Sequence, residues 1–316
     1  MTTGNKRVRR EVNGILLVDK PLGISSNACL QRAKWLYRSA KAGHTGALDP
    51  LATGVLPLCF GEATKVSQFL LEADKRYLTR IRLGQRTDTA DSEGEVIDNH
   101  PVSEVSREDV VNALSHFRGE ITQVPPMYSA LKHQGQPLYK LARAGKEVDR
   151  KRRNVTVYEL VLHEFFNNGE EAWLDLEIHC SKGTYVRTIA DDLGQLLGCG
   201  GHVTVLRRLQ AGAFEIAACV TLDSLQRIAE EQGDEGLDAL LLAPDQAIEH
   251  LPAIRLSDEY AGFVRQGQAV TVRPLPDLTG DDTLVRLYED QEFFGIGAVL
   301  DDGRVAPRRL MRETTR

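Results

Sequence analysis

The stretch GHTGALDPLATG at positions 43–54 constrains the fold of this chain more than any other part of it. Glycine permits backbone angles that other residues avoid, and Pro50 fixes its own φ and pushes Asp49 towards an extended conformation. With three glycines and one proline, the stretch is predicted to form a shaped loop, and not a regular helix or strand. The apolar residues that follow at 55–60 predict a buried strand that anchors this loop.

Asp49 is the carboxylate that the loop would present at a defined angle. A rigid carboxylate on a loop braced by a core suits a catalytic acid, base or nucleophile. An ordinary Asp–Pro turn explains the same local pattern. A functional reading of Asp49 therefore needs partner residues elsewhere in the chain.

The size and composition of the chain indicate a soluble protein with one large domain or two. Its 316 residues are 42% hydrophobic, which is enough for a real core. Residues 1–10 are polar and basic, unlike a secretory signal, and no apolar run approaches the ~20 residues that span a bilayer. The cysteines are odd in number and form no C-x-x-C pair: Cys29, Cys59, Cys180, Cys199 and Cys219. This argues against a disulfide framework and against a zinc site, and it favours a reducing cytoplasm.

The charge of −6 is unevenly distributed. The segment 223–249 carries eight acidic residues and one basic residue, so the rest of the chain is at +1. Local positive patches, and not net charge, determine nucleic-acid binding. The basic clusters fit an RNA or DNA partner, although each alone is equally typical of a solvated surface; they are Lys6–Arg10, Arg150–Arg153, Arg207–Arg208 and Arg308–Arg312.

The pattern of apolar residues predicts helices and strands behind a disordered basic arm at 1–10. Helices are expected at 26–37, 62–72, 106–118, 136–145, 184–197 and within 221–250, and strands at 15–18, 55–59, 77–83, 155–158, 174–178 and 203–209. Short strand-like pieces at 269–272, 284–287 and 295–300 predict a small separate β domain. The expected division is a large domain at 11–250 and a β domain at 251–316.

A second glycine-marked segment, Ser181–Arg187, supplies candidate partners for Asp49. If this stretch is extended, Tyr185 and Arg187 share one face. An arginine beside an aspartate lowers the carboxyl pKa by ~1–3 units, and an ionised, oriented carboxylate suits a nucleophile at a sugar or an electrophilic base. Arg187 could equally form a surface ion pair, and Tyr77 is either a core aromatic or a ring that stacks on a nucleobase.

Several motifs together resemble a known family. The loop 43–54, the segments DKRY at 74–77 and RTDT at 86–89, and Ser181–Arg187 are similar in order and identity to the bacterial B-type tRNA pseudouridine synthases. Lys20-Pro21 and the segment 202–209 fit the same pattern. The resemblance covers residues 12–250, and the tail matches more loosely.

The resemblance implies an α+β protein with the pseudouridine synthase fold. Its catalytic domain, at 11–250, would have a mixed, largely antiparallel sheet flanked by helices, and a small C-terminal RNA-binding β domain of the PUA type would occupy 251–316. The resemblance also implies isomerisation of uridine 55 in the T-loop of tRNA without cofactor or metal. Asp49 would be the nucleophile and Arg187 its partner, with Tyr77 against the target base. His44 would enter the T-loop, and Tyr185 and Leu206 would line the base pocket.

The expected partner is the T-arm and T-loop of tRNA, met by a cytoplasmic monomer that needs no guide RNA and no membrane. Two other readings stay open. One is a tRNA-binding or tRNA-folding module that acts without chemistry, and the other is the catalytic subunit of a guide-dependent synthase. Only an enzyme needs Asp49, Arg187 and Tyr77 together.

Overall fold

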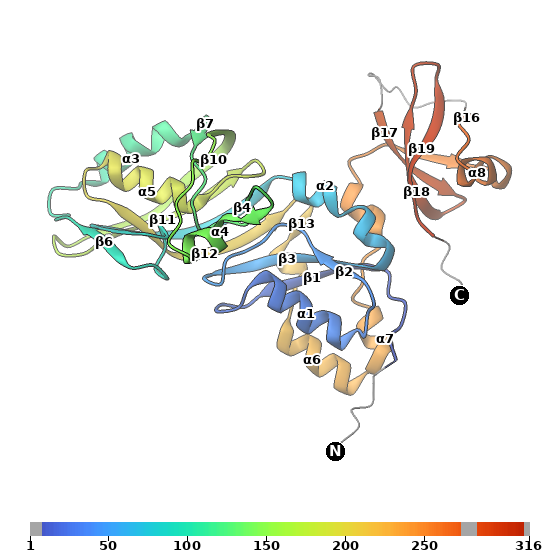
Figure 1. Ribbon diagram of the computed structural model, residues 1–316, viewed down its shortest axis with the longest axis horizontal. Coiled ribbons are helices and arrows are strands. Elements are labelled where there is room, and N and C mark those ends of the chain that lie inside the picture. Colours follow the sequence, from blue (N-terminus) through green and yellow to red (C-terminus); the bar gives the residue numbers. More distant parts are fainter. Residues whose placement is uncertain (1–7, 273–282, 313–316) are drawn as a thin grey trace.

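The structure is a computed structural model that describes residues 8–272 and 283–312. It is elongated, with a large sheet and its helices at one end and a smaller, C-terminal sheet at the other (Figure 1). Most of the predicted arm at 1–10 lies outside the described residues. Arg10, which is described, is fixed in place, because both ends of its guanidinium donate to the Asp238 carboxylate at 2.7 Å.

The large sheet has ten strands and is mixed but largely antiparallel, which confirms the predicted fold class. Only β1 with β14 and β3 with β12 pair in parallel. Strands β2 (Ala42–His44) and β13 (Phe214–Glu215) pair with β3 and β12. The other eight lie in the order β14 (Val220–Thr221), β1 (Gly14–Lys20), β3 (Ala52–Phe60), β12 (Gly201–Ala211), β4 (Lys75–Leu83), β11 (Ala172–Cys180), β10 (Arg153–Asn167) and β7 (Gly119–Gln123).

Strands β1 and β3 are apolar on both faces because both faces are covered. Leu16 and Leu56 pack into a core with α1 (Ser26–Leu36) and α6 (Leu222–Glu231), while Ile15 and Val55 pack into a different core on the opposite face. A strand buried on both sides reads as a continuous apolar run and not as an alternation. The runs at 15–18 and 55–60 are therefore strands, as expected.

The other half of the sheet is covered by α3 (Arg107–Leu114) and α5 (Val186–Leu196) (Figure 1). Residues 172, 174, 176, 178 and 180 of β11 are buried and alternate with half-exposed neighbours, as period-two patterning requires. The buried set packs against Ile189, Ala190 and Leu193 of α5. This core holds the start of α5, and therefore Arg187, at the sheet.

Several predicted boundaries were wrong. The loop at 43–54 is irregular only at 45–51, because its two ends belong to β2 and β3. The expected helix at 62–72 is a 3-10 turn, Gly61–Lys65, followed by α2 (Ser67–Glu72). Helix α3 starts at the predicted Ser106 cap but ends at Leu114, because a 3-10 turn over Ser115–Phe117 leads into β7 at Gly119.

The acidic segment folds as α6, α7 (Gly233–Asp238) and a 3-10 turn, Pro244–Ile248. Two of its carboxylates form ion pairs with arginines of the N-terminal region: Asp238 with Arg10, and Asp234 with Arg38. Tyr37 also donates to the Leu237 carbonyl at 2.6 Å. The segment is thus tied to the residues around α1.

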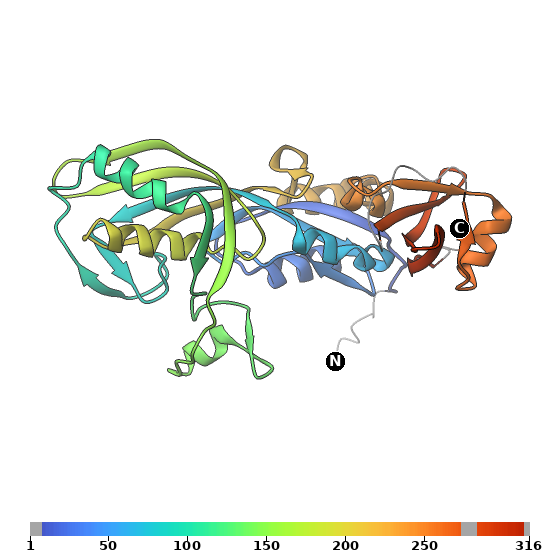
Figure 2. The same ribbon diagram turned by 90° about the horizontal axis from the view of Figure 1, so that it is seen from above.

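Residues 124–152, between β7 and β10, project from the body of the molecule (Figure 2). They form a small hairpin, β8 (Lys132–His133) with β9 (Gln136–Pro137), and α4 (Leu138–Arg143). The sequence predicted a helix at 136–145 with Pro137 in its first turn, but the helix is shorter and Pro137 is its N-cap. The polar stretch at 84–94 contains a short strand, β5 (Gln85–Thr87), which pairs with β6 (Val96–Asn99).

The C-terminal sheet spans residues 253–310 and has the order β15 (Ala253–Leu256), β17 (Thr283–Glu289), β18 (Glu292–Val299), β19 (Arg304–Leu310) and β16 (Val270–Thr271). Helix α8 (Asp258–Arg265) packs on it. The sequence indicated three of these strands and missed β15, β19 and α8. Ile296 joins the core that contains Ile248, and Lys65 donates to the Leu310 carbonyl at 2.7 Å, so the two sheets are in contact.

Gly54 is needed because β12 passes too close for any side chain. Its φ is +106°, and an added Cβ would lie 2.1 Å from the Arg208 carbonyl oxygen. Gly43, in the same motif, has open space around its Cα and lies outside the left-handed region.

We therefore predict that Gly54→Ala lowers the free energy of unfolding by about 1–3 kcal/mol, because β12 must move or the backbone must strain. Gly43→Ala serves as the matched control and is expected to be near neutral. Chemical denaturation of both variants checks this, and equal losses would show that the close approach is unimportant.

Candidate active site

The loop that carries Asp49 is braced by hydrogen bonds on each side of that residue. The Ser26 hydroxyl donates to the Leu48 carbonyl at 3.0 Å and accepts from the Leu48 N–H at 2.7 Å. The Pro50 carbonyl accepts from Gly23 N–H at 2.9 Å, and the Asp49 carbonyl accepts from Ala52 N–H at 3.0 Å, which closes the turn. Asp49 therefore has a fixed backbone direction, as the sequence predicted.

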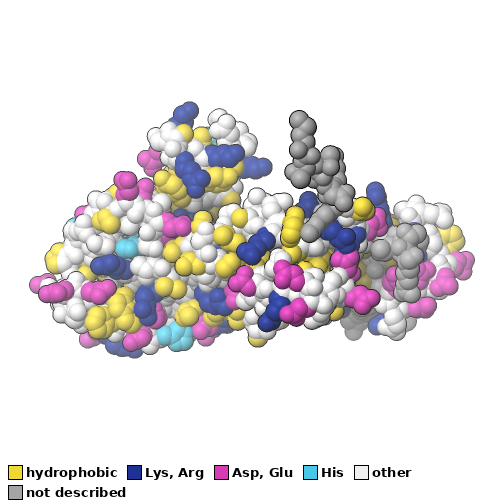
Figure 3. Space-filling view, turned by 90° about the horizontal axis from the view of Figure 1, so that it is seen from below, with side chains coloured by type: hydrophobic (Ala, Val, Ile, Leu, Met, Phe, Trp, Pro, Cys, Tyr) yellow, Lys and Arg dark blue, Asp and Glu magenta, His cyan; other side chains and the backbone are white. Residues whose placement is uncertain are grey.

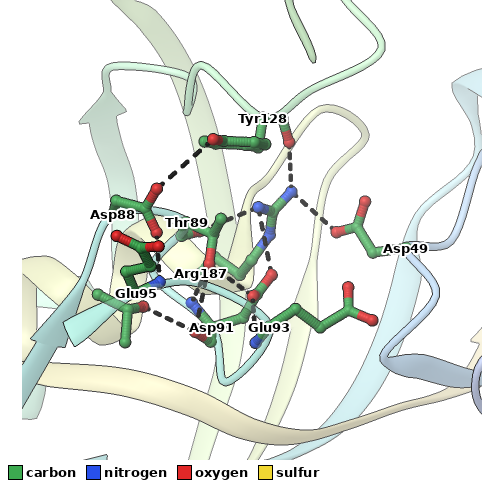
Figure 4. Close-up of polar contacts among 9 residues, drawn as sticks. Asp49, Asp88, Thr89, Asp91, Glu93, Glu95, Tyr128 and Arg187 are labelled. Carbon is green, nitrogen blue, oxygen red and sulfur yellow. Dashed lines mark hydrogen bonds and ion pairs between the residues drawn. The ribbon is translucent and has the colours of Figure 1, made fainter. Parts of the chain in front are cut away.

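Asp49 forms an ion pair with Arg187, which lies 138 positions further along the sequence. The Arg187 Nη2 and Asp49 Oδ2 atoms are 2.8 Å apart (Figure 4). The Arg187 side chain is only 5% exposed, whereas that of Asp49 is 41% exposed. The partnership expected from the two glycine-marked segments is present, and its carboxylate is the member that stays accessible.

Arg187 has three further partners, which hold it in place independently of Asp49. Its Nη1 lies 3.4 Å from the buried Asp91 carboxylate and donates to the Thr89 carbonyl at 3.0 Å, and its Nη2 donates to the Tyr128 carbonyl at 2.7 Å. Asp91 is itself fixed by the Thr89 hydroxyl at 2.7 Å. One guanidinium thus joins the Asp49 loop, the polar turn after β5 and the projecting segment (Figure 4).

The pKa of the Asp49 carboxyl is raised above its ordinary value, which corrects the expectation that Arg187 would lower it overall. Burial is the largest cause and raises the pKa, Arg187 lowers it, and the nearby Asp91 raises it again. Although 41% of the side chain is accessible, that part opens onto cavities walled by protein. Desolvation therefore outweighs the guanidinium.

A cavity of about 360 Å³ contains five of the six predicted site residues in its wall. Asp49 and Arg187 meet there with Tyr77, Tyr185 and Leu206. They come from the loop before β3, from β4, from β12 and from the start of α5. Residues distant in the sequence are thus brought to one concave site, which is the usual form of a binding or catalytic site.

Tyr77 and Leu206 reach this cavity from neighbouring strands. Tyr77 is half-buried and packs on the core below it. Leu206 is 8% exposed and lies in register with Thr79 of β4 and Ala52 of β3. Burial raises the pKa of the Tyr77 phenol, so its hydroxyl is protonated at neutral pH.

Tyr185 and Arg187 do not share an extended face, contrary to the sequence-based expectation. Tyr185 is the N-cap of α5 and Arg187 lies in its first turn, so only the first of them is extended. The Gln123 side chain holds the Tyr185 backbone, accepting from its N–H at 3.0 Å and donating to its carbonyl at 3.2 Å. Both side chains still reach the same cavity, because the helix begins at its wall.

His44 lies in the wall of a second cavity, of about 740 Å³, and not in the first. Asp49 and Arg187 line both cavities, so the ion pair stands where they meet. The buried Nδ1 of His44 has no hydrogen-bond partner among the described residues. Burial and the charge of Arg208 lower the pKa of His44, so its ring is neutral at pH 7.

Sequence reasoning missed Asp91, Tyr128 and Arg208 as site residues. Asp91 lies in a polar, turn-rich stretch without periodicity, and only its proximity to the RTDT motif could have indicated it. Tyr128 contributes a backbone carbonyl, for which side-chain type gives no signal. Arg208 had been assigned to a basic surface cluster.

The cluster Arg207–Arg208 is not a free basic surface. Arg207 forms two bonds with the Asp19 carboxylate, at 2.7 and 3.1 Å, and Arg208 is 1% exposed. The projecting segment, by contrast, displays several Lys and Arg side chains above the body of the molecule (Figure 3). The basic residues in the sequence of this segment are Lys132, Lys140, Arg143, Lys146, Arg150, Lys151 and Arg152.

Within residues 8–272 and 283–312, His, Cys, Asp and Glu side chains nowhere gather in threes in a way that could hold a metal ion. None of the helices there has the length and apolar character to cross a membrane.

Comparison with known proteins places the whole chain in one family. Residues 34–186 match the model of the TruB family pseudouridylate synthase N-terminal domain. Residues 187–249 match the tRNA pseudouridylate synthase B C-terminal domain, and residues 252–311 match the C-terminal model of pseudouridine synthase II TruB. The tRNA pseudouridine synthase B of Stutzerimonas stutzeri is 54% identical over 97% of this chain and 98% of its own, and that of Yersinia pestis (strain Pestoides F) is 52% identical over 98% and 95%.

Solved structures share the fold. A Cbf5-Nop10-Gar1 complex contains a chain with 26% identity and a TM-score of 0.70, which covers 95% of this chain and 84% of that one. An H/ACA RNP bound to a substrate RNA containing 2'-deoxyuridine contains one with 22% identity and a TM-score of 0.71, covering 95% and 85%. Three family models match the chain in sequence order, and relatives are more than half identical to it over nearly their full length. The chain therefore belongs to the TruB family of pseudouridylate synthases.

Proposed function

We propose that this enzyme isomerises uridine 55 in the T-loop of tRNA to pseudouridine, without a cofactor. The observation that carries the proposal is the Asp49–Arg187 ion pair at the meeting point of two cavities. It lies in a chain 54% identical to a tRNA pseudouridine synthase B. The reaction breaks the C–N glycosidic bond, turns the base and forms a C–C bond, with no net redox change or uptake of water.

Asp49 acts as the nucleophile at the target nucleotide. Nucleophilic attack needs an ionised carboxylate that is oriented and accessible, and Asp49 is held by a braced loop while 41% of its side chain stays open. Arg187 supports the ionised form against desolvation. Because Asp91 and two carbonyls hold Arg187, the guanidinium keeps its position when substrate approaches the carboxylate.

The smaller cavity receives the flipped base. Its volume lies within the range of about 300–1,000 Å³ that is typical of ligand sites. Tyr77 lies against the base, while Tyr185 and Leu206 line the pocket. Extruding a base costs a few kcal/mol, and stacking on an aromatic ring, which contributes ~1–3 kcal/mol, offsets much of that cost.

The larger cavity receives the T-loop from which the base has left. His44 is neutral, and its Nδ1 lacks a partner within the described part of the chain, so it can stack or hydrogen-bond there. The basic projecting segment borders the same space through Tyr128 and Arg143. We place the reaction in the cytoplasm, on the T-arm of free tRNA, with the enzyme acting as a monomer and without a guide RNA.

Incubating the purified protein with an unmodified tRNA transcript and mapping pseudouridine by position tests this function. Asp49→Asn, which is nearly isosteric but not nucleophilic, is expected to bind tRNA as wild type and to lose product formation by about 10⁴-fold or more. Appreciable turnover by the variant would remove Asp49 from the mechanism. Binding and refolding of tRNA with no pseudouridine formed by the wild type would favour the binding-module reading.

A stability measurement checks that Asp49→Asn is folded. Since the pKa of Asp49 is raised on folding, its carboxyl contributes stability that is full below the unfolded pKa of about 3.9 and is lost as pH rises through the folded pKa. Asparagine does not titrate. The variant should therefore melt above wild type at neutral pH, and this difference should shrink as pH falls towards 4.

Arg187→Gln is expected to move the pH dependence of the rate. The enzyme needs the ionised form of Asp49, so activity falls as pH drops through the pKa of that carboxyl. Arg187 lowers this pKa, and its removal raises it, which shifts the acid limb of the single-turnover rate to higher pH. The rate at pH 7 should fall by about 100-fold, with little change in the Kd for tRNA.

Arg80→Gln is the matched control for Arg187→Gln. Arg80 also makes a two-pronged ion pair, with both bonds to Asp175 at 2.7 Å, but outside both cavities. Its removal should leave the acid limb in place. A loss of tRNA affinity in Arg187→Gln with an unchanged pH profile would contradict the pairing role.

A further inference from the structure

Arg208 is a buried cation without an acidic partner. It is 1% exposed, and no carboxylate of residues 8–272 or 283–312 forms an ion pair with it. Its Nε donates to the Val55 carbonyl at 2.6 Å, and its Nη2 donates to the Gly46 carbonyl at 3.2 Å. Because buried charges are normally paired, an uncompensated guanidinium in the wall of the smaller cavity calls for a function.

The strand register places Arg208 directly beside Tyr77. The two residues are partners across the antiparallel pair β12 and β4, so their side chains leave the same face of the sheet. Both reach the same cavity. On its other side Arg208 is opposite Gly54, where the absence of a side chain lets β12 approach.

The charge of Arg208 orients the Tyr77 hydroxyl. The two side chains leave the same face of paired strands and line one cavity, and the guanidinium charge acts on the phenol. Because a guanidinium has only donors and is positive, the hydroxyl hydrogen points away from it. Burial raises the pKa of this phenol while Arg208 lowers it, so the hydroxyl is protonated at neutral pH and polarised by the neighbouring charge.

We propose that Arg208 is a positioning residue that acts through Tyr77: it aims the Tyr77 hydroxyl hydrogen into the cavity, at an oxygen of the bound pyrimidine nucleotide. The inference rests on the proposed function and deepens it. It gives Tyr77 a polar role in addition to contact between its ring and the base. No bond to hydrogen is broken in this role.

A purely structural role for Arg208 makes a different prediction. The bonds to Val55 and Gly46 tie β3 and the Asp49 loop to β12, and their loss alone would disturb the loop. That effect does not depend on the Tyr77 hydroxyl. The two roles are therefore separated by whether removal of the hydroxyl abolishes the effect of Arg208.

The kinetic test compares Arg208→Met, Tyr77→Phe and the double variant in single-turnover assays with a T-arm RNA. Arg208→Met should reduce the rate by about 10-fold or more with a change in Kd below about 3-fold, and in the Tyr77→Phe background it should reduce the rate by less than about 3-fold. Equal losses in both backgrounds would overturn the proposal. Arg208→Lys, which keeps the positive charge beside the hydroxyl, should retain more rate than Arg208→Met at a similar melting temperature.

Arg207→Met is the matched control on the same strand. Arg207 is adjacent in sequence, partly buried and paired with Asp19 and not with Tyr77. Its replacement should leave the rate near that of wild type. A loss as large as that of Arg208→Met would show that any break in this strand disturbs the site, and would also overturn the proposal.

A spectroscopic test is independent of turnover. In protein labelled with 3-fluorotyrosine, whose phenol is more acidic than that of tyrosine, the Tyr77 fluorine resonance is identified by its loss in Tyr77→Phe. Its ionisation midpoint should rise in Arg208→Met, because a stabilising cation is lost. If the midpoint is unchanged while the enzyme still modifies tRNA, the proposed role of Arg208 is overturned and the proposed function is not. A wild type that forms no pseudouridine would overturn the proposed function, and this inference with it.

Discussion

One buried guanidinium organises the candidate site. Arg187 is shared between Asp91, which is almost wholly buried, and Asp49, which is not. A buried carboxylate without a cation is costly, so Asp91 makes the position of Arg187 a requirement of folding. The ion pair with Asp49 then uses a cation that is already in place, and the Asp49 carboxylate remains open to the cavities.

This arrangement sets two opposing influences on the pKa of Asp49. Desolvation raises its pKa and makes the carboxylate more reactive than one in water, while Arg187 limits the rise. Arg208, on the other side of the smaller cavity, adds a second buried cation without a carboxylate of its own. The acids of the site lie towards the larger cavity, where Asp88, Asp91 and Glu93 line the wall. The smaller cavity thus favours negative charge more than the larger cavity does.

The sequence was sufficient for the parts of this site that depend on local chemistry. The glycines and proline around Asp49 predicted a shaped loop, and the expected helix starts near positions 26 and 106 are correct. The second glycine-marked segment offered Arg187 as a candidate partner of Asp49, and the resemblance implied the same pairing, although nothing local connects residues so far apart in the chain. Asp91 and Arg208 were missed because their importance lies in burial, which a polar turn and a pair of adjacent arginines do not reveal.

The predicted boundaries failed where tertiary contacts override local preference. Gly119 was expected to end a helix, but the chain leaves that helix at Leu114 and Gly119 begins β7, which pairs with β10. Gly54 was expected in a loop, yet it lies within β3 and gives β12 room to approach. In both cases the glycine had been correctly recognised as a special position, and only its partner strand, distant in sequence, decides what it does.

The projecting segment is joined to the same ion pair. The Tyr128 carbonyl accepts from Arg187 at 2.7 Å, and Arg150 closes the base of the segment by donating to the Pro125 carbonyl at 3.1 Å. This Lys- and Arg-rich segment is therefore in contact with the guanidinium that orients Asp49. Any movement of this segment that displaces Tyr128 takes an acceptor away from Arg187, so the geometry of the carboxylate depends on where this basic surface lies.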